Sequence, residues 1–177
     1  MEDTGQIILD ILKISIPAIL VAAVAYSLVK NHLERDYKLR LLELRQKNAE
    51  VVTPIRLQAY ERITLLLERI TPSNLLLRVS GSGHNATDYH RLLLTEIRNE
   101  FNHNMSQQVY MTDQAWQQVK RAREEVVNLI NKSYQTMPDK SKGTDLAKRI
   151  LENVLTEEVD PTARALSFLK QEISQVF

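Results

Sequence analysis

The residues best suited to metal or acid–base chemistry are Glu96, Glu100 and His103. Their i, i+4 and i+7 spacing would place all three side chains on one face of a helix. Di-iron carboxylate bundles use two E-x-x-H steps together with two further glutamates. The Glu100–His103 pair is the single E-x-x-H step in this sequence. We therefore predict no catalytic residue, no cofactor and no committed metal site, and keep these three residues as the weak candidates for one.

The composition of the chain argues against several other kinds of chemistry. The chain has 23 Lys and Arg against 22 Asp and Glu, so no overall field would attract nucleic acid, and we expect no nucleic-acid partner. Cysteine is absent, which excludes disulfides, thiolate chemistry and Cys-based zinc sites. The loop of residues 80–85 is rich in Gly and Ser but lacks the lysine of a phosphate-binding loop.

A run without charge, ISIPAILVAAVAYSLV, covers residues 14–29. As a helix it spans roughly 24 Å, slightly less than the ~30 Å hydrocarbon core of a bilayer. A cleaved signal peptide and a buried helix of a soluble protein are the alternatives, but the chain starts Met-Glu-Asp, without a positive n-region. The favoured interpretation is a single transmembrane span within residues 1–30.

Charges on either side of the span predict its orientation. Glu2 and Asp3 precede the span, and basic residues dominate the stretch after it. These are Lys30, Arg35, Lys38, Arg40, Arg45 and Lys47. Because basic residues close to a span favour the cytoplasm, we expect the N-terminus outside and the rest of the chain inside.

Residues 31–54 are predicted to form a helical stalk, because no glycine lies between positions 6 and 80 and no proline between 17 and 54. Part of the stalk has the 4-3-4-3-4 spacing of a short coiled coil. This seam consists of Tyr37, Leu41, Leu44, Asn48, Val51 and Ile55. Two interpretations remain open, packing on the chain's own domain and self-association; the second predicts a weak parallel homodimer with Asn48 at an a position.

Residues 55–177 are predicted to form a small helical bundle, because every start signal is helical and no period-two alternation is long enough for a sheet. Expected helix starts are Thr71-Pro72, Thr87 or Asp88, Thr112, Thr144 or Asp145, and Asp160-Pro161. An extended link is expected around residues 109–111. The fold class is therefore all-α.

Two stretches carry a family resemblance. Residues 58–62, QAYER, lead into LLLERITPSNLLLR, and EIRNEFNHNMSQQVY at 96–110 leads towards Trp116. They resemble a family of short, uncharacterised single-span membrane proteins of Bacteroidota-type bacteria. The resemblance implies a bacterial inner membrane and carries over no functional residue. Polar residues inside these stretches would hold helices together or face a partner: Tyr60, Arg62, Arg78, Asn104, Gln107 and Gln108.

The sequence thus predicts a membrane-anchored helical scaffold or adaptor that binds a protein partner through a cytoplasmic bundle. The alternative is a small membrane-bound metal-binding protein or enzyme that uses Glu96, Glu100 and His103.

Overall fold

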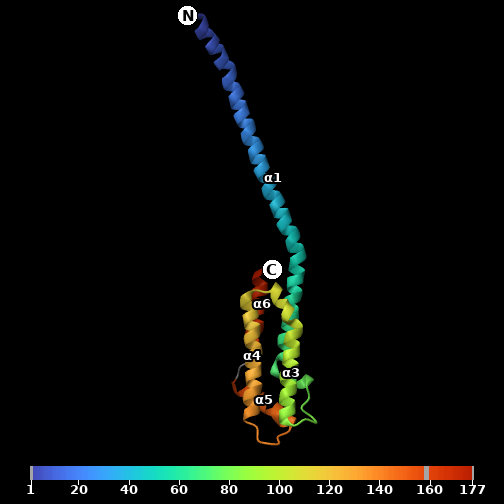
Figure 1. Ribbon diagram of the computed structural model, residues 1–177. Helices are drawn as coiled ribbons and strands as arrows, with labels where there is room; N and C mark the ends of the chain where they lie inside the picture. The colour runs from blue at the N-terminus through green and yellow to red at the C-terminus, as the bar shows by residue number, and fades with distance from the viewer. Residues whose placement is uncertain (1, 158–159, 177) are drawn as a thin grey trace. The chain divides into compact units, whose positions relative to one another are not determined.

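The computed structural model describes the backbone of residues 2–157 and 160–176, and the side chains of residues 13, 15–17, 19–156 and 160–175. Over this part of the chain it is all-α, with no β-strand, as the sequence predicts. The helices in order are α1 (Glu2–Ile70), α2 (Pro72–Arg78), α3 (Ala86–Asn104), the 3₁₀ helix η1 (Met105–Tyr110), α4 (Asp113–Gln135), α5 (Gly143–Glu157) and α6 (Ala163–Val176) (Figure 1). The chain divides into two compact units, residues 1–52 and 53–177.

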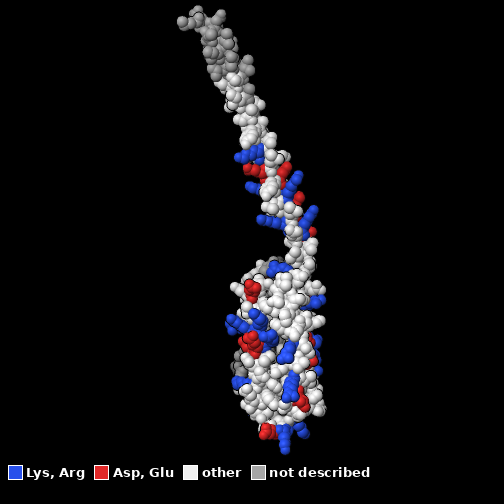
Figure 2. Space-filling model, in the orientation of Figure 1, with Lys and Arg blue, Asp and Glu red and all other residues white. Residues whose placement is uncertain are grey.

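The first unit consists of the N-terminal part of α1. This helix is long and apolar enough, by length and composition, to cross a membrane, and none of its most apolar window is buried. Ile19, Val21 and Leu28 are each more than 60% exposed. In Figure 2 a length of α1 without charged atoms is followed by a length that carries both blue and red side chains.

The second unit is a helical bundle with one continuous core. The C-terminal part of α1 contributes Tyr60, Ile63, Leu67 and Ile70 to this core. An apolar stripe on α4 is buried, because its residues recur with the helical period. It consists of Ala115, Val119, Ala122, Val126 and Ile130, with Trp116 beside it.

Four of the expected boundaries need correction. Helix α5 begins at Gly143, before the expected Thr144 or Asp145, because Asp145 lies inside the first turn and its carboxylate accepts the N–H of Lys142 at 3.0 Å. The cap of α3 is Asn85, not Thr87 or Asp88: its side chain accepts a hydrogen bond of 2.8 Å from the backbone N–H of Asp88. The expected extended link is largely the 3₁₀ helix η1, which follows α3 directly. Helix α6 begins at Ala163, because the Asp160 carboxylate first accepts the N–H of Thr162 in a turn.

The expected cap at Thr112 is confirmed, since its hydroxyl accepts the N–H of Ala115 at 3.2 Å. Pro72 occupies the first turn of α2, where its missing N–H costs nothing. This turn after α1 sets the position of α2, and α2 in turn positions Arg78 in its last turn.

Candidate functional site

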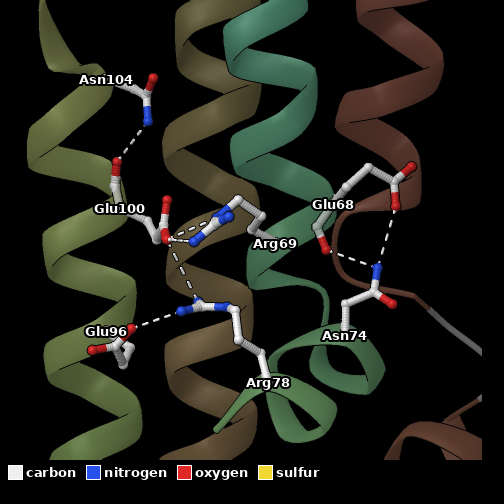
Figure 3. A network of polar contacts seen from close by, with 7 residues as sticks. All are labelled: Glu68, Arg69, Asn74, Arg78, Glu96, Glu100 and Asn104. Atoms are coloured by element: carbon white, nitrogen blue, oxygen red, sulfur yellow. Dashed lines mark hydrogen bonds and ion pairs between the residues drawn. The ribbon is translucent and has the colours of Figure 1, made fainter.

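Glu96, Glu100 and His103 lie on one side of α3, as the sequence spacing predicts. Arg69, in the last turn of α1, and Arg78, in the last turn of α2, reach two of them. Figure 3 shows both guanidinium groups converging on Glu100, with Arg78 also extending towards Glu96. Three helices therefore meet at one charged network.

The distances define a chain of charge-assisted hydrogen bonds. Arg69 donates to Glu100 Oε1 through Nε at 2.8 Å, and its terminal nitrogen lies 2.6 Å from the same oxygen. Arg78 donates to Glu96 Oε2 at 2.7 Å, and its other terminal nitrogen lies 3.6 Å from Glu100 Oε1. The Glu100 side chain is only 16% exposed. A carboxylate this shielded needs such partners, because an unpaired charge would lose much of its hydration.

A side-chain amide extends the network. The Asn104 amide, almost fully buried, donates to the Glu100 carbonyl oxygen at 2.9 Å. On the other side of α1's end, the amide of Asn74 donates to the Glu68 carbonyl oxygen at the same distance (Figure 3). The Asn104 hydrogen bond thus lies within the last turns of α3, whereas the Asn74 hydrogen bond joins α2 to the end of α1.

A groove of about 610 Å³ adjoins the network. Its lining residues come from α1 and α3: Arg62, Leu65, Leu66, Arg69, Asn99, Glu100, His103 and Asn104. Arg62 and Asn99 are exposed. The groove therefore offers cationic and amide donors beside an apolar floor, a combination suited to binding a side chain or segment with a carboxylate.

A second groove, of about 780 Å³, runs along the other side of α1 towards α6. Its lining is more apolar: Pro54, Ile55, Leu57, Gln58, Glu61, Thr64, Leu65 and Ile173. Leu65 lines both grooves and is 55% exposed. Leu65 therefore lies between the first groove, which Arg62 and Arg69 make cationic, and the more apolar second groove.

The arrangement is unfavourable for the metal alternative. Within the described side chains, no group of three or more His, Asp or Glu residues is placed to hold a metal ion. Glu96 and Glu100 are instead bound by guanidinium groups, whose positive charge opposes a metal cation at the same oxygens. His103 lines the cationic groove.

The seam residues lie along α1 and are exposed. Tyr37 is 71%, Leu44 61% and Val51 65% exposed, and Asn48 is exposed between them. Leu41 at 38% and Ile55 at 41% are the least exposed of the set.

Of the polar residues predicted to hold helices together or face a partner, Arg78 and Tyr60 bond between helices and Asn104 bonds within α3. Arg69 and Glu172, which were not predicted, are the partners in two such contacts. No local pattern could have found Arg69, because its partner Glu100 lies 31 residues away. The available signal for such a pair was the presence of opposite charges on two helices that were expected to be neighbours.

The fold defines an all-α protein with a long, partly apolar N-terminal helix and a helical bundle. A family described as "Family of unknown function (DUF7935)" matches residues 6–176, and the chain belongs to this family. The expectation of an uncharacterised family is thereby confirmed, while the single span and the bacterial group stay predictions. No curated protein and no solved structure matches the chain.

Proposed function

We propose that this protein is a membrane-anchored helical adaptor. A single N-terminal span fixes it in the bacterial inner membrane, and its bundle, on the cytoplasmic side, binds a protein partner. The observation that carries the proposal is the exposed apolar run of α1, in which no described side chain is buried.

An apolar run of this length is costly in water. Fully burying a Val, Leu, Ile or Phe side chain is worth about 1.5–3 kcal/mol. Residues 15–29 include Ile16, Ile19, Leu20, Val21, Val24, Leu28 and Val29, all more than half exposed. Exposed apolar surface on this scale marks a membrane or a protein interface. The absence of charge between residues 14 and 29 favours the membrane.

The proposed orientation and location rest on sequence. Acidic residues lie before the run and basic ones after it, which favours a cytoplasmic bundle. The resemblance to single-span proteins of Bacteroidota-type bacteria supports the inner membrane as the location.

The proposed role of the bundle rests on its surface. The surface around Leu65, with a cationic groove on one side and an apolar groove on the other, is the kind of mixed surface that binds protein segments. The two carboxylates named as candidates for catalysis, Glu96 and Glu100, are paired with arginines. Binding is therefore favoured over catalysis.

Fractionation and topology reporters test the anchor. The full chain should stay in the membrane after carbonate extraction, and Val21→Arg combined with Val24→Arg should release it. Leu39→Arg combined with Leu42→Arg, outside the run, is the matched control and should leave it in the membrane. A reporter fused after Phe177 should be active only as a cytoplasmic fusion; periplasmic activity would overturn the orientation.

Site-specific photo-crosslinking in cells tests the partner surface. A photoreactive residue at Asn99, in the cationic groove, should give a discrete adduct that disappears with Arg62→Glu. The control places the same photoreactive residue at the exposed position Lys148 on α5, where it should give no adduct. Equal labelling from both positions would contradict a specific surface. Stoichiometric iron, manganese or zinc in the purified protein, lost with His103→Ala, would instead support the metal alternative.

A further inference from the structure

The seam of the stalk is bordered by positive charge on both sides. With Asn48 at an a position, Lys38 and Arg45 occupy e positions, and Arg40 and Lys47 occupy g positions. The acidic residues of the same stretch, Asp36, Glu43 and Glu50, all fall at c positions, away from the seam. The e and g positions from residue 38 to 47 therefore carry four bases and no acid.

These bases have no ion pair in the described part of α1. The polar contacts formed between residues 30 and 52 are His32 with Asp36 at 3.7 Å and Gln46 with Glu50 at 3.4 Å. The seam residues between the bases are exposed, with Leu44 at 61% and Val51 at 65%. An apolar stripe between two unpaired basic rows is thus open along this helix.

A second copy of the chain fits this surface poorly. In a parallel pair of identical helices, Arg40 of one would face Arg45 of the other, and the symmetry would repeat the clash. In an antiparallel pair, e faces e and g faces g, which again brings bases together. Like charges at these positions specify against self-pairing, in the way that coiled coils choose their partners.

An anionic lipid surface explains only part of the pattern. At 1.5 Å per residue, Arg40 lies roughly 16 Å and Lys47 roughly 27 Å along the helix from Val29, the last residue of the apolar run. Electrostatic attraction to a membrane decays over a Debye length of about 8 Å at physiological salt. The more distant bases would therefore be attracted only weakly to anionic lipid. A partner helix that lies along the seam would contact all four bases.

We propose that residues 37–51 bind an acidic amphipathic helix of a partner protein, as one strand of a heterotypic coiled coil. The partner helix carries apolar residues at a and d, Glu or Asp at e and g, and a polar residue opposite Asn48. A buried Asn at an a position costs stability but fixes the register, so it suits a pairing selected for specificity. A seam of about two heptads binds weakly alone, and a partner held at the same membrane gains from the raised effective concentration. The inference rests on the proposed function only for the anchor.

The test uses the purified full chain in nanodiscs of neutral phosphatidylcholine. The probes are two synthetic three-heptad peptides with Leu at a and d and Asn at the central a position; one has Glu at every e and g position, the other Lys. We expect the Glu peptide to bind and the Lys peptide not to bind. Arg40→Glu combined with Arg45→Glu should weaken binding of the Glu peptide by about tenfold or more and allow the Lys peptide to bind. Arg35→Glu, at a b position, should change either affinity less than about twofold.

Several results would overturn the proposal: equal binding of the two peptides, binding of neither, or no effect of the charge reversal. Efficient disulfide dimers of Asn48→Cys in membranes, with little at Lys47→Cys, would assign the seam to a second copy. Binding of the bases to phosphatidylserine vesicles, without peptide binding, would assign them to lipid. Because the peptides bind to purified protein, a failed topology or fractionation test would remove the anchor and leave this result standing.

Discussion

The hydroxyl of Tyr60 donates a hydrogen bond of 2.7 Å to Glu172 Oε1, joining α1 to α6 across 112 residues of sequence. Tyr60 is 1% exposed. The second oxygen of Glu172 is buried and has no hydrogen-bond partner within the described part of the chain. The hydrogen bond therefore satisfies one of the two oxygens of the Glu172 carboxylate, and the other oxygen is buried without a partner in the described part of the chain.

Tyr60→Phe should destabilise the bundle by about 1–3 kcal/mol, because it leaves both carboxylate oxygens of Glu172 without a partner. The change is measured as the urea midpoint of the full chain in detergent, followed by fluorescence of Trp116, the single tryptophan. Glu172→Gln is the matched variant: its amide oxygen still accepts from Tyr60 and no charge is buried, so its loss should be smaller. An unchanged urea midpoint in Tyr60→Phe would contradict this account.

Stability at alkaline pH should depend on Tyr89. Burial raises the pKa of this phenol from 10.0 to about 12, and its hydroxyl donates to the Val79 carbonyl oxygen at 2.6 Å. Below pH 10 the stabilisation is fully present. As pH rises from about 10 to 12, the unfolded chain releases this proton while the folded chain retains it, so stability falls.

Tyr89→Phe should be less stable than the wild type near pH 8 but lose stability less steeply between about pH 10 and 12. Urea midpoints at about pH 8, 10 and 11.5 measure both slopes. Tyr37→Phe, at an exposed residue, is the control and should run parallel to the wild type. Parallel slopes for Tyr89→Phe as well would show that Tyr89 does not carry the alkaline loss.

Arg69 and Arg78 should act together, because both contact the same oxygen of Glu100. Arg69→Gln and Arg78→Gln alone should each cost about 0.5–1 kcal/mol, since solvent screens these partly exposed pairs. The double variant should cost more than the sum, because only then is the shielded Glu100 left without a cation. Arg149→Gln, which removes an exposed pair with Glu152, should cost almost nothing. Strict additivity would mean that the two arginines are independent.

Two loops of the bundle approach through glycine backbones. A Cβ on Gly81 would lie 2.7 Å from the backbone carbon and oxygen of Gly143. The loops are joined there by hydrogen bonds of 2.9 Å from Gly143 N to the His84 oxygen and from Ala86 N to the Ser141 oxygen. Since backbone cannot rotate out of the way as a side chain can, the approach requires glycine.

Gly81→Ala should therefore destabilise the bundle by roughly 2 kcal/mol or more, as overpacking against backbone does. Gly83→Ala is the control: its Cβ would meet open space, and the cost of about 1 kcal/mol comes from its φ of +80° alone. Thermal unfolding monitored by circular dichroism ranks the two variants. A larger loss for Gly83→Ala would contradict the close approach.

The sequence by itself determined the elements of this protein, because the signals that start and pattern a helix act within one or two turns. The cap at Thr112, Pro72 at the start of α2 and the buried stripe through Val119 and Val126 could all be predicted in this way. Where two local signals competed, prediction failed. Asn85, which follows the turn at Gly83, caps α3 in place of Thr87 or Asp88, and the turn at Asp160 delays α6 to Ala163.

Tertiary structure alone decided which residues meet. Glu96 and Glu100 were visible as a spaced pair that could hold a metal, but the turn between α1 and α2 brings Arg69 and Arg78 to them and makes the site an ion-pair network. The same holds for Tyr60 with Glu172 and for Gly81 with Gly143. Periodicity specifies which face of a helix is buried, whereas contacts between distant residues depend on how whole helices pack. Packing is set by the combined shape of the core, and no local run of residues encodes it.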